Sequence, residues 1–301
     1  MSETPHIALL PDGRRLHLQH GPIDLVIEAF GRDAAIGAAY QAAARRFEGV
    51  LSELAGELAV LRAPASTDAA RADGPIAQNM LAAVAPFARG CFITPMAAVA
   101  GAVADDILAH MTAAAPLERA YVNNGGDIAL HLSPGTNLSL GLVDRPDCPS
   151  LFARAALSAE SPVRGIATSG RHGRSFSLGI ADAVTVLAAT AAKADAAATI
   201  IANAVDLPGH PAITRIPANA IKPDSDLGAI PVTRHLGPLR PGEVMAALQR
   251  GAERARQLLA QKLIHAAALH LTGETLIVGD GDNALLSTPK QNQDREKRLD
   301  A

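Results

Sequence analysis

"RAYVNNGGDIALHL" (residues 119–132) does most to decide the fold class of this chain. Two apolar runs flank Asn124-Gly125-Gly126, and Asn-Gly and Gly-Gly pairs are leading signals for a tight β-hairpin turn. The preceding segment, TPMAAVAGAVADDILAHMTAA (94–114), predicts a helix that Thr94 can cap and that Pro95 can begin. The chain therefore places a helix directly before an antiparallel pair of strands.

The same order of helix and then strands occurs twice along the chain. Strands are predicted within 6–30, one long helix or two helices broken near Gly49 over 33–62, and a further helix over 75–88. In the second part the segments are a strand over 175–188, a helix over 191–205, a Pro-rich stretch over 206–241, a helix over 243–263 and a last strand pair over 265–279. This order predicts an α+β class in which helices cover mainly antiparallel sheets.

Composition restricts the function classes. The chain has 301 residues, of which 49% are hydrophobic and 19% charged, and this is typical of a folded globular protein. A net charge of -3 without a basic block outside the tail argues against nucleic acid as the main partner. The N-terminus lacks a secretory signal pattern, and no uncharged apolar run reaches about 18 residues. We therefore expect a cytoplasmic protein that does not bind membranes, and its Ala-rich surface makes a homodimer plausible.

The alanine-rich helix AAKADAAATIIANAV (191–205) carries three polar residues at intervals of four. Positions i and i+4 lie about 40° apart around a helix, so Asp195, Thr199 and Asn203 share one stripe. A carboxylate and a hydroxyl placed in this way suit a hard cation such as Mg²⁺, which prefers oxygen ligands. The alternative is that this stripe is the solvated face of a surface helix.

Two further segments carry candidate ligand-binding groups. In VNNGGDIAL (122–130), Asn124, Gly125, Gly126 and Asp127 could hold a phosphate against the main chain, or form only a hairpin turn. In GIATSGRHGR (165–174), the donors of Thr168, Ser169 and Gly170, followed by Arg171, His172 and Arg174, suit an anionic ligand; the alternative is a solvated loop. The chain contains no GxxxxGK[ST] loop, no GxGxxG after a strand and no GxSxG elbow.

In this order, VNNGGDIAL, GIATSG, VTVLA and ADAAAT resemble the ApbE-like superfamily of flavin transferases. The similarity covers roughly residues 90–205 and is greatest to a smaller, uncharacterised cytosolic UPF-type branch, which shares a PMAAVAGAVA-type helix. The resemblance implies a T-fold-like duplication and an enzyme that moves FMN from FAD onto a protein hydroxyl with the help of Mg²⁺.

The resemblance also implies roles for individual residues. Asp195 and Thr199 match the metal ligands, and a backbone carbonyl near Ala98 to Ala100 completes the metal site. The flavin-nucleotide pocket corresponds to Asn124, Gly125, Gly126 and Asp127 and to the loop of Thr168, Ser169 and Gly170. Asp127 is also the candidate group that orients or deprotonates a nucleophile.

Two departures from the family pattern leave the activity open. Ala100 stands where the family has a lysine before glycine, and the ten residues RHGRSFSLGI replace a longer HIIDPRTG-type segment. Three functions follow: Mg²⁺-dependent chemistry on a flavin- or nucleotide-like phosphorylated molecule, non-catalytic binding of FAD, FMN or a nucleotide, and a role in a methanopterin-linked one-carbon pathway. We expect one domain over 1–285, which could consist of two similar halves of about 1–120 and 121–285, and a polar, disordered tail over 286–301.

Overall fold

The computed structural model describes residues 4–66, 71–144, 150–279 and 285–288. The chain divides into two compact units. The first consists of residues 1–136, 158–167 and 188–196, and the second of residues 137–157, 168–187 and 197–301. Whether the chain acts as one domain, as predicted, stays a prediction, and so does the predicted tail, most of which lies outside the described residues.

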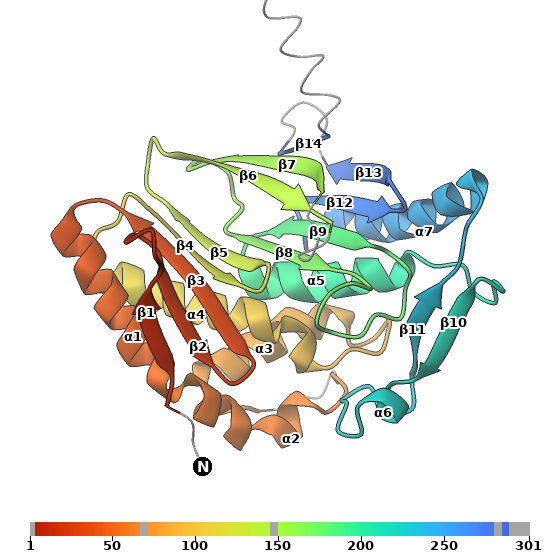
Figure 1. The fold of residues 1–301 in the computed structure, drawn as a ribbon, viewed down its shortest axis with the longest axis horizontal. Helices are drawn as coiled ribbons and strands as arrows, with labels where there is room; N and C mark the ends of the chain where they lie inside the picture. Colours follow the sequence, from red (N-terminus) through yellow and green to blue (C-terminus); the bar gives the residue numbers. More distant parts are fainter. Residues whose placement is uncertain (1–3, 67–70, 145–149, 280–284, 289–301) are drawn as a thin grey trace, which may run out of the picture. The chain divides into compact units, whose positions relative to one another are not determined.

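The first unit contains an antiparallel sheet whose strands occur in the order β1-β2-β3-β4-β5-β8. Helices α1 and α4 lie against this sheet, and α3 packs on α4 (Figure 1). The elements are β1 (His6–Leu9), β2 (Leu16–His20), β3 (Ile23–Phe30), α1 (Asp33–Gly56), α2 (Leu58–Leu61), α3 (Pro75–Val84), α4 (Val99–Ala114), β4 (Arg119–Asn124), β5 (Asp127–Leu132) and β8 (Gly165–Ser169, of which the last two residues belong to the second unit). Short 3-10 helices, η1 (Ala85–Phe87) and η2 (Pro95–Ala98), follow α3 and precede α4.

The second unit contains the antiparallel strands β9, β12 and β13, and α7 packs against β12 and β13; two smaller sheets complete this unit (Figure 1). The smaller sheets have the strand orders β14-β7-β6 and β10-β11. The elements are β6 (Asn137–Val143), β7 (Leu151–Ser158), β9 (Ala183–Ala188), β10 (Ile213–Pro217), α6 (Ala218–Ile221), β11 (Pro231–Leu236), α7 (Pro241–Ala260), β12 (Ala266–Leu271), β13 (Glu274–Gly279) and β14 (Leu286–Ser287). Helix α5 (Ala191–Ala204) begins in the first unit and ends in the second.

The element order confirms the predicted α+β class. The order of two strands, two long helices and two strands occurs twice, as β2-β3-α1-α4-β4-β5 and as β8-β9-α5-α7-β12-β13. Other elements lie within and between these two runs, among them α2, α3, β6, β7, β10, α6 and β11. This repeat is in line with the T-fold-like duplication that the resemblance implies. The predicted hairpin also forms: β4 and β5 pair from Arg119↔Leu132 to Asn124↔Asp127.

Several predicted boundaries differ from the structure, and two of the differences have a clear physical reason. Helix α1 passes through Gly49 and ends at Gly56. A single exposed glycine costs about 1 kcal/mol, and burial of Phe47, Val50 and Leu54 on the other face outweighs that cost. The strand predicted over 175–188 begins only at Ala183, because the segment before it hydrogen-bonds to the end of α5 through Ile180 N and Val205 O.

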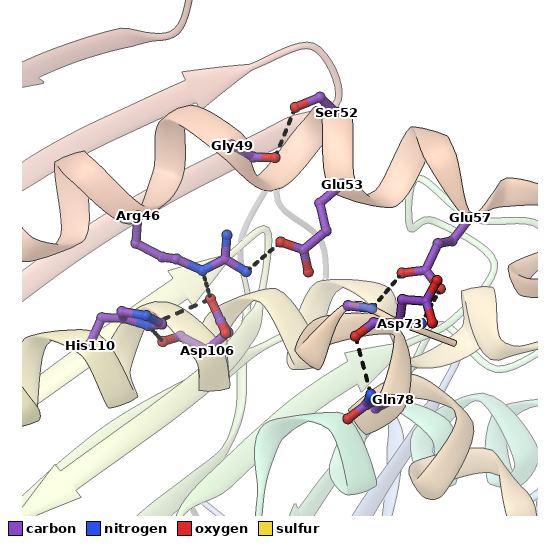
Figure 2. Close-up of polar contacts among 10 residues, drawn as sticks. Arg46, Gly49, Ser52, Glu53, Glu57, Asp73, Gln78, Asp106 and His110 are labelled. Atoms are coloured by element: carbon purple, nitrogen blue, oxygen red, sulfur yellow. Dashed lines mark hydrogen bonds and ion pairs between the residues drawn. The ribbon is translucent and has the colours of Figure 1, made fainter. Parts of the chain in front are cut away.

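Ion pairs and a side-chain cap hold the helices of the first unit together (Figure 2). The Arg46 guanidinium on α1 donates to Asp106 Oδ2 on α4 at 2.6 Å and to Glu53 Oε2 at 2.8 Å. The Glu57 carboxylate accepts the backbone N–H groups of Asp73 and Gly74, each at 2.8 Å, and thereby caps the start of α3. These contacts fix α1, α3 and α4 relative to one another.

In the described part of the chain, one helical stretch, Pro95–Ala114, has the length and mean hydropathy (1.2) that a membrane span requires. Over its most apolar part 44% of the residues are buried inside the fold, and the core helix of a globular protein can have the same length and hydropathy. Its apolar character is explained by packing, because Ala102, Val103 and Ile107 are fully buried.

Candidate functional site

Helix α5 is largely buried, and the three residues of its polar stripe are partly exposed. Eight of its residues are fully buried, whereas Asp195, Thr199 and Asn203 are partly exposed and Lys193 is exposed. The fully buried residues are Ala191, Ala192, Ala194, Ala196, Ala197, Ala198, Ile201 and Ala202. The burial of the residues around the stripe argues against the alternative that it is the wide solvated face of a surface helix.

Two carboxylates cap the facing ends of α4 and α5 reciprocally. Asp195 on α5 accepts the N–H of Gly101, in the first turn of α4, with a distance of 3.1 Å from N to Oδ2. Asp105 on α4 accepts the first two N–H groups of α5, from Ala191 at 3.0 Å and from Ala192 at 2.9 Å. Each carboxylate accepts hydrogen bonds from amides in the first turn of the other helix, and these amides have no partner within that helix. Each carboxylate therefore also lies near the positive, N-terminal end of the other helix's dipole.

Glycine at position 101 makes this arrangement possible. A Cβ atom added to Gly101 would lie 2.3 Å from the carbonyl oxygen of Ala191 and 2.4 Å from its carbonyl carbon. Such distances lie far inside van der Waals contact, so only glycine lets α4 approach α5 this closely. The close approach also brings the amides of α4 to Asp195.

The charges around Asp195 and Asp105 differ. Burial and the neighbouring Asp127 carboxylate raise the pKa of Asp195 well above its ordinary value, against the lowering effect of the Gly101 and Ala100 amides. Burial also raises the pKa of Asp105, but hydrogen bonds from Ala192, Ala191, Asn79 and Thr190 oppose that shift. Within the described part of the chain, Asp195 interacts with amides and other carboxylates and with no cationic side chain. Asp105 is thus well satisfied, whereas Asp195 lies next to like charge.

The hairpin residues lie where the sequence analysis placed them, and their local geometry is that of a tight turn. Gly125 (φ +65°) and Gly126 (φ +112°) form the two-residue connection between β4 and β5, and the Gly126 N–H donates to Asn123 Oδ1 at 2.8 Å. Asn124 Nδ2 donates to the carbonyl oxygen of Ala100 on α4 at 3.2 Å. Because Asp127 is directly opposite Asn124 in the strand register, its side chain shares the face that meets α4.

The first unit therefore brings together the predicted residues Asn124, Asp127 and Asp195 and the Ala100 carbonyl. Carboxylate and carbonyl oxygens are the donors that Mg²⁺ prefers, and a cation would offset the repulsion between Asp127 and Asp195. Among the described residues no group of three or more His, Cys, Asp or Glu side chains could hold a metal ion. A cation here would need hydroxyl, carbonyl, water or phosphate oxygens for its remaining positions, and the residues present fit Mg²⁺ on those terms.

The second unit contains the other predicted site residues. Thr168 and Ser169 end β8 and are partly exposed, and Thr168 Oγ1 lies 2.8 Å from Thr185 Oγ1. A Cβ atom on Gly170 would lie 2.3 Å from the Asp182 carbonyl oxygen, so this glycine is needed for packing. Thr199 is partly exposed, and Asn203 Oδ1 accepts the Leu178 N–H at 3.0 Å, which gives Asn203 a structural role.

Sequence reasoning missed two carboxylates. Asp105 stands in an Asp-Asp pair inside an otherwise apolar helix, and Asp182 stands inside the apolar run GIADAVTVLA. A buried acid requires a hydrogen-bond or ion-pair partner, so an acid within an apolar segment could have indicated a partnered, buried carboxylate at both positions. The Arg171 guanidinium, expected to attract an anionic ligand, instead donates to Asp182 Oδ1 from Nε at 2.9 Å.

Fold and site define an α+β protein in which α4 and α5 cap each other and α5 carries a partly exposed acid and hydroxyl one turn apart. The chain belongs to the family described as AbpE bacteria, whose model matches residues 7–277. This result confirms the resemblance to ApbE-like proteins.

Relatives in the UPF0280 group match part of the chain. A UPF0280 protein of Methanopyrus kandleri is 40% identical over 128 residues, which is 42% of this chain and 48% of that protein. A UPF0280 protein of Methanocaldococcus jannaschii is 36% identical over 113 residues, 37% of this chain and 45% of that protein. The chain thus matches about half the length of these relatives.

Among solved structures, the fold is similar to a point mutant of the flavin transferase ApbE from Vibrio cholerae, with a TM-score of 0.49 and 12% identity over 89% of this chain and 98% of that chain. At this distance the similarity bears on neither the activity nor the site of this protein.

Proposed function

We propose that this protein binds a flavin- or nucleotide-like phosphorylated molecule together with Mg²⁺ and catalyses a group transfer on it. One observation supports the proposal most: on a buried helix, Asp195 and Thr199 reach solvent one turn apart, and Asp195 lies beside Asp127 without a cationic partner among the described residues. A buried helix retains such a pair at a cost in stability, which is typical of a binding site.

Each residue has a definite part in this proposal. Asp195 and Thr199 hold the metal through a carboxylate and a hydroxyl oxygen, and Asp127 contributes negative charge from the hairpin. Thr168, Ser169 and Gly170 contact the phosphorylated ligand, and Asn124 fixes the Ala100 carbonyl through its side-chain amide. When bound, Mg²⁺ neutralises phosphate charge and polarises the bond that breaks.

Calorimetry with FAD, FMN and ADP, each with and without Mg²⁺, tests the binding. We expect Mg²⁺ to strengthen binding of at least one of the three. Asp195→Asn keeps an oxygen that can accept the Gly101 N–H but removes the charge, so the Mg²⁺-dependent gain should fall by about tenfold or more.

Asp105→Asn is the matched control, because Asp105 makes the reciprocal cap but has no part in the proposed metal site. It should keep the Mg²⁺-dependent gain. Equal losses in the two variants would show that the caps alone matter and would contradict the assignment of Asp195.

A second candidate function is flavin or nucleotide binding without turnover. Ala100 in place of the family's lysine and the short segment 171–180 favour it. Release of AMP from FAD in the presence of Mg²⁺, measured by chromatography, would support catalysis, and binding without AMP release would support the accessory role.

A role in methanopterin-linked one-carbon metabolism is the third candidate, and the archaeal source of the UPF0280 relatives favours it. Including tetrahydromethanopterin in the same calorimetry tests it. A cytoplasmic location, the absence of nucleic-acid and membrane partners and a homodimeric state belong to the proposal as well; sedimentation velocity measures the last.

A further inference from the structure

The sheet of the first unit ends at β1, an edge strand that pairs only with β2 among the described residues. An edge strand exposes a row of unpaired backbone N–H and C=O groups, and proteins usually protect it with charged side chains, prolines or a covering segment. The four residues of β1, His-Ile-Ala-Leu, include no Lys, Arg, Asp, Glu or Pro. The sequence of β1 therefore leaves this edge open to another strand.

The register of β1 and β2 shows which main-chain groups of β1 point outward. Leu10 N donates to Arg15 O at 2.8 Å, and this pair continues the register of the two strands by one residue. Because hydrogen-bonded and non-hydrogen-bonded pairs alternate in an antiparallel ladder, Ala8 also faces β2, whereas the N–H and C=O groups of Ile7 and Leu9 point away from it. Within the residues that the structure describes, these outward groups have no hydrogen-bond partner.

The side chains of Ile7 and Leu9 extend the apolar face of the sheet to its edge. Ile7 is opposite Leu18 and Leu9 is opposite Leu16, and residues directly opposite in an antiparallel pair share a face. Leu16 and Leu18 are buried on the face that α1 contacts, whereas Ile7 is 38% exposed and Leu9 is 55% exposed. An added strand would therefore continue both the hydrogen-bond ladder and the apolar row.

The open edge is complementary to itself. When two β1 strands pair antiparallel about a twofold axis at Ala8, Ile7 of each copy is opposite Leu9 of the other, and both pairs exchange N–H···O=C bonds in both directions. The next outward pair is Pro5 with Pro11, neither of which has an N–H, so no donor is left over. A register that placed Ile7 opposite itself would leave the Leu9 carbonyl facing Pro5, which cannot donate.

We propose that β1 pairs in this register with β1 of a second copy of the chain and that this edge is the interface of the homodimer. The inference rests on the homodimeric state within the proposed function and is independent of the ligand chemistry. A twofold axis gives both copies the same contacts, as in most soluble dimers. Four strand residues a side are far fewer than the about 20–30 of a standard interface, so the dissociation constant lies in the micromolar range or above.

The first experiment measures the oligomeric state of the full chain. Sedimentation velocity from micromolar to submillimolar protein should show a monomer–dimer equilibrium. Leu9→Lys places a charge on the edge, which opposes strand pairing, and should weaken the dimer by about tenfold or more. Val143→Lys is the matched control, because Val143 is also an exposed apolar strand residue but lies in β6, and it should dimerise as the wild type does. Far-UV circular dichroism checks that both variants fold.

The second experiment tests the register. About the proposed axis, Ala8 is opposite itself in a non-hydrogen-bonded pair, whose Cα atoms lie about 4.5 Å apart, and a disulfide can bridge that distance. In a background of Cys91→Ser and Cys148→Ser, Ala8→Cys should form a disulfide-linked dimer on mild oxidation. Val143→Cys in the same background should stay monomeric on a non-reducing gel.

The results separate the interface from the rest of the proposal. A dimer that Leu9→Lys leaves as stable as the wild type, or an Ala8→Cys variant that does not cross-link, would overturn the β1 interface and leave the homodimer standing. A protein that is monomeric at every concentration would overturn both the interface and the homodimeric state. Binding of FAD, FMN or ADP is measured separately by calorimetry, so its failure would overturn the ligand chemistry alone.

Discussion

Gly101→Ala should destabilise the protein strongly because of one backbone contact. The added Cβ would lie 2.3 Å from the Ala191 carbonyl oxygen, whereas nonbonded heavy atoms are most stable at about 3.5–4.0 Å. The added Cβ is attached directly to the backbone of α4, and the atom that it meets is a backbone oxygen of α5, so neither can rotate away. Helices α4 and α5 would therefore have to separate by about 1 Å. That movement would lengthen the bond from Gly101 N to Asp195, which is already 3.1 Å, and those from Ala191 and Ala192 to Asp105.

The magnitude follows from these contacts. Overpacking costs about 1–3 kcal/mol, and weakening a cap costs about 0.5–2 kcal/mol at each of the two helix ends. We expect the free energy of unfolding to fall by about 3–5 kcal/mol, measured by urea denaturation with far-UV circular dichroism.

Gly49→Ala is the matched control. Gly49 is also a helix glycine, but it is exposed, and a Cβ there would meet nothing within 4 Å. It should stabilise the protein by about 0.5–1 kcal/mol through helix propensity. If Gly101→Ala unfolds within about 1 kcal/mol of the wild type, the close approach of α4 and α5 is not what holds this site together.

Further predictions concern the tyrosines and the ion pairs of the first unit. Burial and the hydrogen bond to Glu28 raise the pKa of Tyr121 to about 12, and burial also raises the pKa of Tyr40. The neutral tyrosines therefore contribute their full stabilisation of the fold below about pH 10, and the contribution of Tyr121 is lost as the pH rises towards 12. Because the chain has two tyrosines, tyrosinate absorbance near pH 10.5 should be small in the folded protein and large in urea, and Glu28→Gln should bring the titration of Tyr121 closer to pH 10; equal absorbance in both states would contradict this. Arg46→Met should lower the free energy of unfolding by about 2 kcal/mol, because the Asp106 carboxylate, which is 10% exposed, loses its guanidinium partner and keeps only the more distant His110 ring; adding Asp106→Asn should restore part of the loss, and no recovery would contradict the pairing.

The sequence predicts elements well where local chemistry decides them. The Asn-Gly-Gly turn predicts the β4–β5 hairpin, and the conformations of Gly125 and Gly126 require it. The start of β9 could not be predicted, because segment 175–182 has the composition of a strand and is diverted by bonds to the distant α5. Gly49 left one long helix or two helices open, and the structure has one, because tertiary burial of α1 outweighs the weak local cost of one glycine.

The candidate site was predictable only in part, for a related reason. The spacing of Asp195 and Thr199 is visible in the sequence, but only the fold shows that the helix around them is buried. The partner of Asp195, the first turn of α4, lies far away in sequence and is brought near by Gly101, a residue that reads as an ordinary helix glycine.

The reciprocal caps separate structural acids from functional ones. Asp105 and Asp195 each accept backbone N–H groups at the start of a helix, so capping alone gives no reason for their environments to differ. Yet the neighbours of Asp105 are hydrogen-bond donors, whereas Asp195 also faces the Asp127 carboxylate. Because the Asp127 charge raises the pKa of Asp195, Asp127→Asn should lower the pKa of Asp195 and weaken Mg²⁺-dependent nucleotide binding. A variant that binds nucleotide with Mg²⁺ as well as the wild type does would show that the two carboxylates do not share a cation.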